Sequence, residues 1–108
     1  MQYTNVKEAF KAMLEGFDPE EAEGLELVYQ INITGDQSSR WYLIIKDEKC
    51  EMAEGVHDAP NLTMTMSPET CLKWLNKEAS GVKLFMSGEV QSEGNVMLAP
   101  KIEELFVF

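Results

Sequence analysis

The sequence is poor in basic residues, in cysteine and in long apolar runs, and each shortage excludes a class of protein. Nine Lys and Arg stand against nineteen Asp and Glu, so the net charge is −10. This charge has the wrong sign for binding a nucleic acid backbone or an anionic membrane surface. The longest unbroken apolar run covers only residues 41–45, and the N-terminal residues lack the apolar core of a signal peptide. We therefore expect an acidic, soluble, cytoplasmic protein with no nucleic acid partner and no strong membrane association.

The two cysteines and the single histidine form no pattern typical of catalysis or metal binding. Cys50 and Cys71 match no CxxC spacing, and we expect both to be reduced thiols of the core. His57 precedes Asp58 in a loop, but no nucleophile elbow accompanies it, so a solvated histidine is the better interpretation. The acidic residues within positions 47–54 lack the cadence of a calcium loop, and no glycine pattern matches a phosphate-binding fingerprint. The sequence thus predicts no enzyme activity, no metal and no cofactor.

The chain begins with helical patterns. Its 108 residues are enough for one domain with a single core, spanning residues 1–108. Thr4 is a candidate cap for a first helix, in which apolar side chains recur at helical spacing until Gly16. The sequence DPEE at residues 18–21 has the form of a helix start, which predicts a second, short helix ending near Glu23.

From residue 25 the apolar period changes to two, which indicates strands. Three segments alternate apolar and polar residues and are separated by turn-forming residues, so they predict a meander with one solvated face: residues 25–33, 40–46 and 49–54. Residues 62–66 predict a fourth strand, and residues 88–91 are a candidate fifth. The middle of the chain therefore predicts a sheet.

The C-terminal half adds three helical segments. Ser67 and the following Pro-Glu form a helix start, which predicts a helix through about Lys77. A further short helix is expected over residues 81–86, and a terminal helix begins near Asn95. Pro100 opposes the carbonyl group four residues earlier, so the terminal helix is expected to be kinked or to start later.

Short motifs follow one another in the C-terminal half in a fixed order. TMTM at residues 63–66 comes before the Ser-Pro-Glu helix start, and Leu72 and Leu75 lie on that helix. LFMSG occupies residues 84–88, and GNVMLAPKIEELF occupies residues 94–106. In this order the motifs resemble the type-two sterol carrier protein family. The segments upstream are compatible with that family but carry no distinctive motif.

The resemblance implies an α+β fold in which helices cover a five-stranded mixed sheet, with an apolar tunnel between the two layers. It implies non-enzymatic, intracellular lipid transport, in which the tunnel binds a hydrophobic small molecule such as a fatty acid, acyl chain, sterol or isoprenoid. Carried over by position, the lipid-binding residues would be Met64, Met66, Leu72, Leu75, Phe85, Met86, Met97, Leu98 and Ile102.

One departure from the family narrows the implied ligands. Where the family usually carries Gly-Lys-Leu-Lys, this chain has Gly-Glu-Val-Gln at residues 88–91. The two missing lysines would remove contacts to a CoA phosphate. The resemblance therefore implies lipid binding without implying recognition of CoA.

The methionines of the implied lining allow two interpretations. Methionine is flexible and polarizable, which suits a wall that must accommodate chains of varied shape. The alternative is that Met64 and Met66 fill an ordinary core, and the same fold would then serve as a protein-interaction or dimerisation module. An empty cavity of about 300 Å³ costs about 7 kcal/mol at ~24 cal/mol per Å³. We therefore expect a tunnel that is partly collapsed without lipid, or a protein that is purified with lipid bound.

The chain ends in four apolar residues, 105–108, with the sequence LFVF. Apolar residues at a chain end must pack, pair or lie exposed. We expect them to pack over the tunnel mouth. A homodimer contact is the second interpretation, and membrane contact, which the acidic charge disfavours, is the third.

Overall fold

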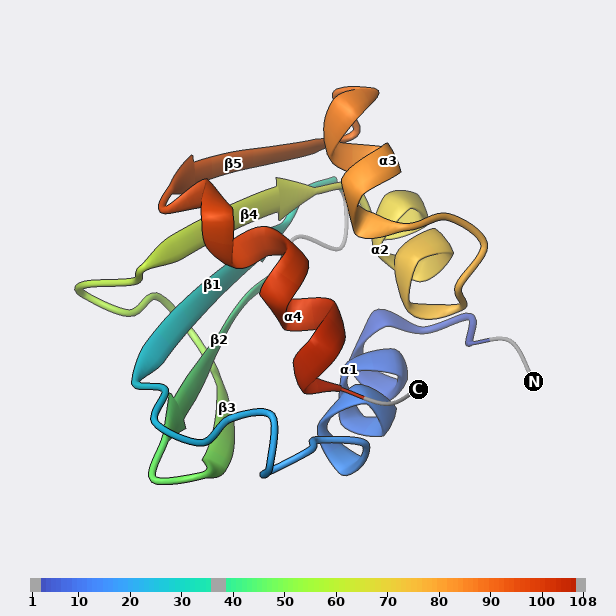
Figure 1. The fold of residues 1–108 in the computed structure, drawn as a ribbon. Coiled ribbons are helices and arrows are strands. Elements are labelled where there is room, and N and C mark those ends of the chain that lie inside the picture. Colours follow the sequence, from blue (N-terminus) through green and yellow to red (C-terminus); the bar gives the residue numbers. More distant parts are fainter. Residues whose placement is uncertain (1–2, 36–38, 107–108) are drawn as a thin grey trace.

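The computed structural model describes residues 3–35 and 39–106, which form one sheet with helices packed against it (Figure 1). In chain order the elements are α1 (Val6–Glu15), β1 (Leu27–Ile33), β2 (Ser39–Lys46), β3 (Lys49–Glu54), β4 (Leu62–Met66), α2 (Pro68–Leu75), α3 (Gly81–Met86), β5 (Val90–Gly94), the 3-10 helix η1 (Val96–Leu98) and α4 (Ala99–Leu105). The α+β class and the five strands expected from the sequence are confirmed.

The sheet is mixed, and its strand order is β3-β2-β1-β4-β5. The first three strands form the expected antiparallel meander. β4 then crosses to the far side of β1 and pairs with it in parallel, with Met64 opposite Ile31. β5 completes the sheet antiparallel to β4. This crossover places the two C-terminal strands side by side, next to the chain segments that carry the motifs described above.

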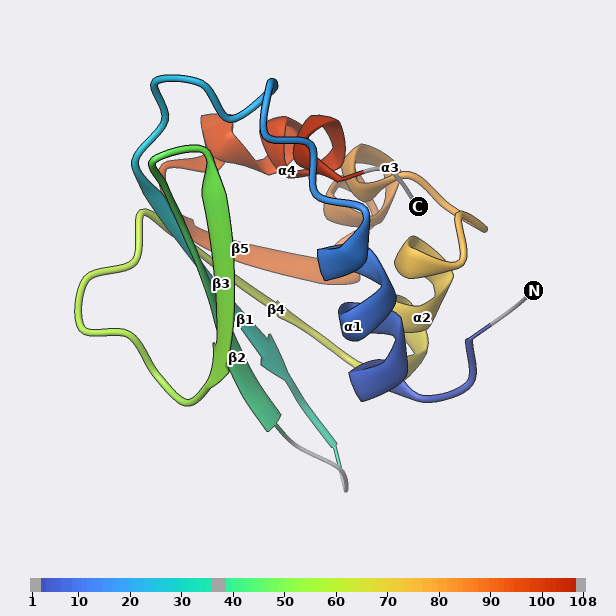
Figure 2. The same ribbon diagram turned by 90° about the horizontal axis from the view of Figure 1, so that it is seen from below.

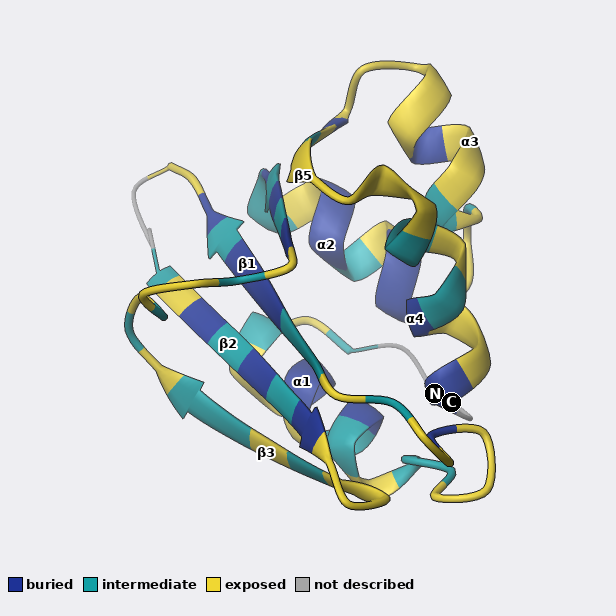
Figure 3. Ribbon diagram, turned by 60° about the vertical axis from the view of Figure 1, so that its left-hand side comes forward, coloured by how far each residue is buried: buried dark blue, intermediate teal, exposed yellow. Residues whose placement is uncertain are grey.

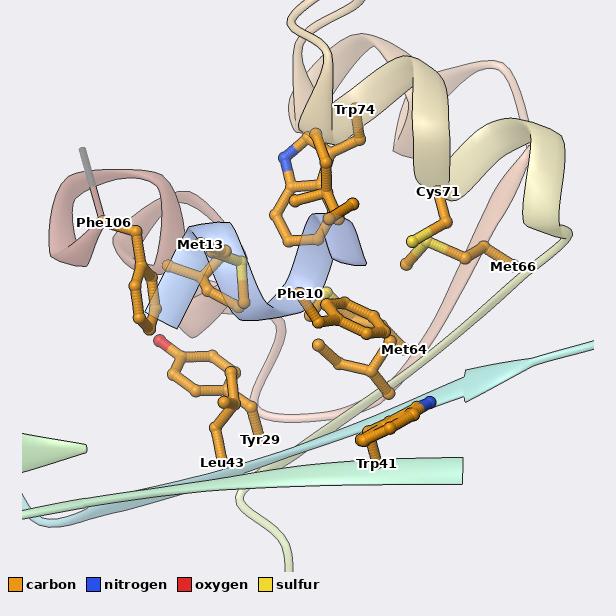
Figure 4. Close-up of a cluster of buried hydrophobic side chains, with 14 of the residues drawn as sticks. Phe10, Met13, Tyr29, Trp41, Leu43, Met64, Met66, Cys71, Trp74 and Phe106 are labelled. Atoms are coloured by element: carbon orange, nitrogen blue, oxygen red, sulfur yellow. The ribbon is translucent and has the colours of Figure 1, made fainter. Parts of the chain in front are cut away.

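Helices cover one face of the sheet, and the other face is open (Figure 2). Burial alternates along the strands accordingly, as the dark segments of β1 and β2 show (Figure 3). Side chains of the covered face meet Phe10 and Met13 of α1 and Trp74 of α2 in one core (Figure 4). The covered face is contributed mainly by Tyr29, Ile31, Ile33, Trp41, Leu43, Ile45, Leu62, Met64 and Met66.

Gln30 is an exception on the open face of β1, because it is only 2% exposed. The loop of residues 55–61 covers it. Gln30 Nε2 donates to Asn32 Oδ1 and to the carbonyl oxygen of Gly55, and its Oε1 accepts from the His57 N–H at 2.9 Å. The expectation of a solvated face is therefore wrong at Gln30. Alternation identifies a face but not the loop that folds over it. His57, expected as a solvated residue of that loop, is half-buried, and its ring lies 5.4 Å from the ring of Tyr42.

The short helix expected to end near Glu23 is wrong. The chain instead makes successive turns, in which the N–H groups of Ala22 and Glu23 donate to carbonyl groups three residues earlier. Gly24 then adopts φ +77°, a left-handed conformation that glycine accepts readily. The segment changes direction before enough residues are fixed to propagate a helix.

Two helix boundaries also differ from the expectation. Asn5, not Thr4, caps α1, and its Oδ1 accepts from the Glu8 N–H at 3.2 Å. Ser67 caps α2 as expected, but the helix ends at Leu75 rather than near Lys77. The sequence therefore predicted both helices and a polar capping side chain for each, but the α1 cap and the α2 end differ from the prediction by one or two residues.

The last strand and helix start later than the motifs indicated. Gly88 has φ +86° and belongs to the turn before β5, so the strand is Val90–Gly94 rather than residues 88–91. The 3-10 helix η1 occupies the start expected near Asn95, and α4 begins at Ala99 with Pro100 in its first turn. The late start expected from Pro100 is confirmed. In the first turn of a helix the backbone N–H groups have no partner within the helix, so proline, which lacks this donor, is tolerated there.

The described C-terminal residues pack into the core. Leu105 and Phe106 are buried, and the Phe106 ring lies 5.6 Å from the ring of Phe17. Val107 and Phe108, which were expected to share this role, lie outside the described residues. The two cysteines are free thiols as expected, Cys71 buried and Cys50 half-buried.

Candidate functional site

A small apolar pocket lies between the C-terminal strands and the helices α2, α3 and α4. Its volume is about 20 Å³, far below the ~300 Å³ of the smallest typical ligand sites. At this pocket, therefore, the structure does not show the expected tunnel. The residues around the pocket are Met64, Met66, Trp74, Gly81, Phe85, Val90, Ser92, Ala99, Ile102 and Glu103.

The floor of the pocket comes from β4 and β5. Alternation along β4 directs Met64 and Met66 toward the helices. Val90 lies opposite Met66, and Ser92 lies opposite Met64. Because residues directly opposite each other in an antiparallel pair share a face, these four side chains lie side by side under the helices.

The helices α2, α3 and α4 cover the pocket on the side opposite the sheet, and we call this covering layer the roof. Trp74 of α2 and Ile102 of α4 are buried, and Figure 4 shows Trp74 above the sheet on the same side as Met66. Phe85 of α3 is 42% exposed. The roof is therefore tightly packed on α2 and α4 and looser on α3.

The predicted lining residues divide into three groups. Met64, Met66, Phe85 and Ile102 line the pocket together. Leu75 is buried elsewhere in the core, and Leu72 and Leu98 are half-buried against it. Met86 and Met97 are each 80% exposed and lie outside the pocket.

Sequence reasoning missed six lining residues: Trp74, Gly81, Val90, Ser92, Ala99 and Glu103. Trp74 was recognisable, since it belongs to the apolar stripe of α2. Val90 and Ser92 depend on the register of β5, whose sequence VQSEG has no apolar alternation. Glu103 is a polar residue on an amphipathic helix, and nothing in its spacing marks a contact.

Glu103 joins the three roof helices. Its Oε1 accepts from the Trp74 indole N–H of α2 at 3.2 Å and from the backbone N–H of Gly81 at the start of α3. The position of Gly81 leaves room for this contact, because a Cβ there would collide with the same carboxylate oxygen. A single side chain of α4 thus holds α2 and α3 over the pocket.

Ser92 brings a polar atom to the apolar floor. Its Oγ is buried and has no hydrogen-bond partner, and within residues 3–35 and 39–106 no other buried side-chain nitrogen or oxygen is in this state. Burying a hydroxyl without a partner costs about 1–3 kcal/mol. A group that can pair with Ser92 would therefore be favoured in this pocket.

A hydrogen bond from the Tyr29 side chain connects the segment after β5 to the sheet. Its hydroxyl donates to the carbonyl oxygen of Leu98 at 2.9 Å. Burial raises the pKa of Tyr29 above its usual value, and the charge of Glu104 adds to this effect. The phenol therefore stays protonated and keeps its donor, which fixes the start of α4 at one side of the pocket.

Two observations concern reactive and metal-binding groups among the described residues. Burial raises the pKa of the Cys71 thiol from 9.0 to about 12, which opposes formation of the nucleophilic thiolate. No cluster of three metal-ligating side chains occurs in the described chain. Among the same residues no helix is long and apolar enough to cross a membrane.

Known proteins share this sequence pattern over most of the chain. Hydroxysteroid dehydrogenase-like protein 2 of Rattus norvegicus is 28% identical over 101 residues, which are 93% of this chain and 19% of that protein. The protein of the same name from Homo sapiens is 24% identical over 93% of this chain and 24% of its own length. The chain thus spans about a fifth of the length of these curated relatives.

Solved structures share the fold. Palmitated SCP2L2 from Aedes aegypti is 26% identical, with a TM-score of 0.74 over 96% of this chain and 93% of that chain. The apo form of sterol carrier protein 2 from Yarrowia lipolytica has the same TM-score of 0.74 at 21% identity, over 89% of this chain and 84% of that chain. The model of the SCP-2 sterol transfer family matches residues 8–107. The chain therefore belongs to the SCP-2 sterol transfer family.

Proposed function

We propose that this chain is a non-enzymatic carrier of one hydrophobic small molecule, bound between β4, β5 and the roof helices. The candidate ligands are a fatty acid, an acyl chain, a sterol or an isoprenoid. The single observation that carries the proposal is an apolar pocket enclosed by the motifs of a lipid-binding family. A neighbour of similar fold is named as palmitated, which supports a long alkyl chain as a ligand here.

The pocket must widen to act in this way. Reaching even 300 Å³ requires about 280 Å³ more than the present 20 Å³. An empty volume of that size costs about 7 kcal/mol, comparable with the whole stability of a small domain. The closed pocket is thus the expected state without ligand, and a bound chain offsets the cost of opening because it fills the new volume.

The element best suited to move is α3. Only Leu84 is buried on this helix, whereas Val82, Phe85 and Met86 are exposed. The segments on either side of α3 contain left-handed residues, Lys77 at φ +60° and Gly88 at φ +86°. Displacing α3 therefore exposes little additional apolar surface and opens the pocket beside Phe85.

The gain on binding is large enough. A sixteen-carbon chain gains about 13 kcal/mol at ~0.8 kcal/mol per buried methylene. Micromolar affinity needs only about 8 kcal/mol of this, which leaves the remainder to offset ordering and association.

The proposal is tested by native mass spectrometry and thermal unfolding of delipidated protein with palmitate and 1-hexadecanol. A ligand that binds only the folded state raises the melting temperature, and the mass of a one-to-one complex should appear. Ala99→Leu, which adds bulk to the pocket wall, should remove most of the shift. Ala53→Leu on the open face of β3 is the matched control and should retain it. Protein that stays lipid-free and unshifted with both compounds contradicts the proposal.

A second function is favoured by the near-filled state of the pocket. At about 20 Å³ this pocket is almost filled by its own side chains, as a protein-interaction or dimerisation module of the same fold requires. Leu105 and Phe106 are buried within their own chain, so a homodimer would not form through these two side chains. A concentration-dependent dimer that ignores both lipids would support this alternative and refute the carrier.

A further inference from the structure

A second cavity lies beside the apolar pocket, and we call it the outer cavity. Its volume is about 250 Å³, compared with about 20 Å³ for the apolar pocket. Its lining residues Lys77, Ser80 and Glu103 are exposed, so the outer cavity opens at the surface of the protein. The other residues that line it are Trp74, Ala79 and Phe106.

Trp74 and Glu103 line both cavities, so they form the wall between them. In Figure 4 Trp74 lies between Phe106, which lines the outer cavity, and Met66, which lines the apolar pocket. The hydrogen bond from the Trp74 indole N–H to Glu103 Oε1, at 3.2 Å, closes this wall. Because Glu103 is exposed, its carboxylate can exchange this partner for water. Rotation of this side chain, together with displacement of α3 from Gly81 onward, therefore joins the two cavities.

The outer cavity has the polarity and the size of a site for a lipid head group. Lys77 and Glu103 place one charge of each sign on its wall. The Oγ atom of Ser80 accepts from the Lys83 N–H at 3.1 Å and keeps its own proton to donate. A volume of about 250 Å³ corresponds to about eight water molecules at ~30 Å³ each, which is more than one hydroxyl or carboxylate group fills. A head with several hydroxyl groups matches this wall, because hydroxyl groups both donate and accept.

We propose that the outer cavity binds the polar head of a single-chain lipid, and that this head is an uncharged polyol, as in a monoacylglycerol. The chain of the lipid passes between Trp74 and Glu103 into the apolar pocket. This inference rests on the proposed carrier function and adds to it the place and the chemical class of the head group. Ala79 lines only the outer cavity and Ala99 only the apolar pocket, so the two alanines separate the head from the chain.

Isothermal titration calorimetry of the delipidated protein with 1-decanoylglycerol, 1-decanol and decanoate tests the proposal. The wild-type protein should bind 1-decanoylglycerol about tenfold more tightly than the other two, because only its head forms the additional hydrogen bonds. Ala79→Leu, which fills the outer cavity, should weaken 1-decanoylglycerol about tenfold and 1-decanol by less than about twofold. Ala99→Leu should weaken all three. Ala59→Leu, at an exposed position of the loop of residues 55–61, is the matched control and should change none of the affinities.

A measurement by NMR on the wild-type protein does not depend on whether the variants fold. The glycerol protons of bound 1-decanoylglycerol should give nuclear Overhauser effects to the Ala79 methyl group. The indole N–H resonance of Trp74 should shift, whereas that of Trp41, which donates to Ser39 Oγ at 2.9 Å, should stay in place. Nuclear Overhauser effects from the glycerol protons to the ring of Phe85, and none to Ala79, would overturn the proposed head-group site.

The outcomes separate this inference from the carrier function. If the wild-type protein binds none of the three lipids, the carrier proposal fails and the inference fails with it. If 1-decanol or decanoate binds as tightly as 1-decanoylglycerol, the carrier function stands and the polyol head is refuted. If Ala79→Leu weakens all three lipids equally, the outer cavity does not hold the head group, and the carrier function again stands.

Discussion

Replacing Ser92 with alanine is expected to stabilise the ligand-free protein, although polar-to-apolar changes within a sheet are often neutral. The Ser92 hydroxyl is buried without a partner, and such a group costs about 1–3 kcal/mol relative to its hydrated state. Alanine removes the oxygen and leaves the backbone pairing of β5 unchanged. The small void left behind lowers the gain, so we expect the free energy of unfolding to rise by about 1 kcal/mol.

Urea unfolding of delipidated protein, followed by circular dichroism, measures this change. A gain of about 1 kcal/mol should raise the urea midpoint by roughly 0.5 M at an unchanged slope, and the melting temperature by about 4 °C. The matched control is Ser87→Ala. Ser87 Oγ donates to the carbonyl oxygen of Leu84 at 2.9 Å and lies 3.0 Å from Glu89 Oε2. Its removal should lower stability by about 0.5–1 kcal/mol.

The test is whether the two serine substitutions change the free energy of unfolding in opposite directions. If Ser92→Ala lowers stability as much as Ser87→Ala does, the Ser92 hydroxyl has a partner in solution. The statement that this hydroxyl is buried without a partner would then be wrong. Bound lipid must be removed before the comparison, since a ligand paired with Ser92 would stabilise the wild-type protein selectively.

Three further predictions test the surrounding structure. Gly94→Ala should destabilise the protein by more than about 2 kcal/mol, because φ is +103° and a Cβ would lie 2.6 Å from the Asn61 carbonyl oxygen. Gly24→Ala, with φ +77° and open space around the Cβ, should cost only about 1 kcal/mol in the same urea assay. Burial raises the Cys71 pKa from 9.0 to about 12, so the unfolded chain ionises first and stability falls as pH rises from 9 toward 12. Across this window the free energy of unfolding of the wild-type protein should fall by about 1.4 kcal/mol per pH unit more than that of Cys71→Ala. If the free energies of unfolding of the two proteins depend equally on pH, burial does not raise the pKa of Cys71. Glu103→Ala removes the acceptor that holds α2 and α3, so stopped-flow release of 1-hexadecanol should accelerate several-fold, whereas Glu103→Gln retains an acceptor oxygen and should release it at nearly the wild-type rate.

The sequence predicted the elements whose patterns are local. The meander strand Lys49–Glu54, the strand Leu62–Met66 and the helix Gly81–Met86 form within the expected bounds, because alternation and glycine boundaries define them without distant contacts. Residues 18–23 have a good helix start but form turns, and Gly24 then reverses the chain in a left-handed conformation at φ +77°. Local start signals therefore predict where a helix can begin, not whether it continues.

Four lining residues of the candidate site were predictable, two on β4 and two on the helices, namely Met64, Met66, Phe85 and Ile102. Met64 and Met66 face the pocket because alternation along β4 fixes their side. Met86 follows Leu84 by two positions on a short helix, which turns it about 200° away, and it is exposed. Ser92 and Glu103 depend on the register of β5 and on contacts between helices. These are tertiary features, and no spacing in the sequence encodes them.

The most direct test of the account is NMR of protein labelled with [13C-methyl]methionine during titration with 1-hexadecanol. Met64 and Met66 line the pocket, whereas Met52 lies on β3 at the other edge of the sheet. We predict that the methyl resonances of Met64 and Met66 shift in proportion to bound lipid while that of Met52 stays in place. Unchanged Met64 and Met66 resonances at saturating lipid would contradict the claim that this pocket opens to hold it.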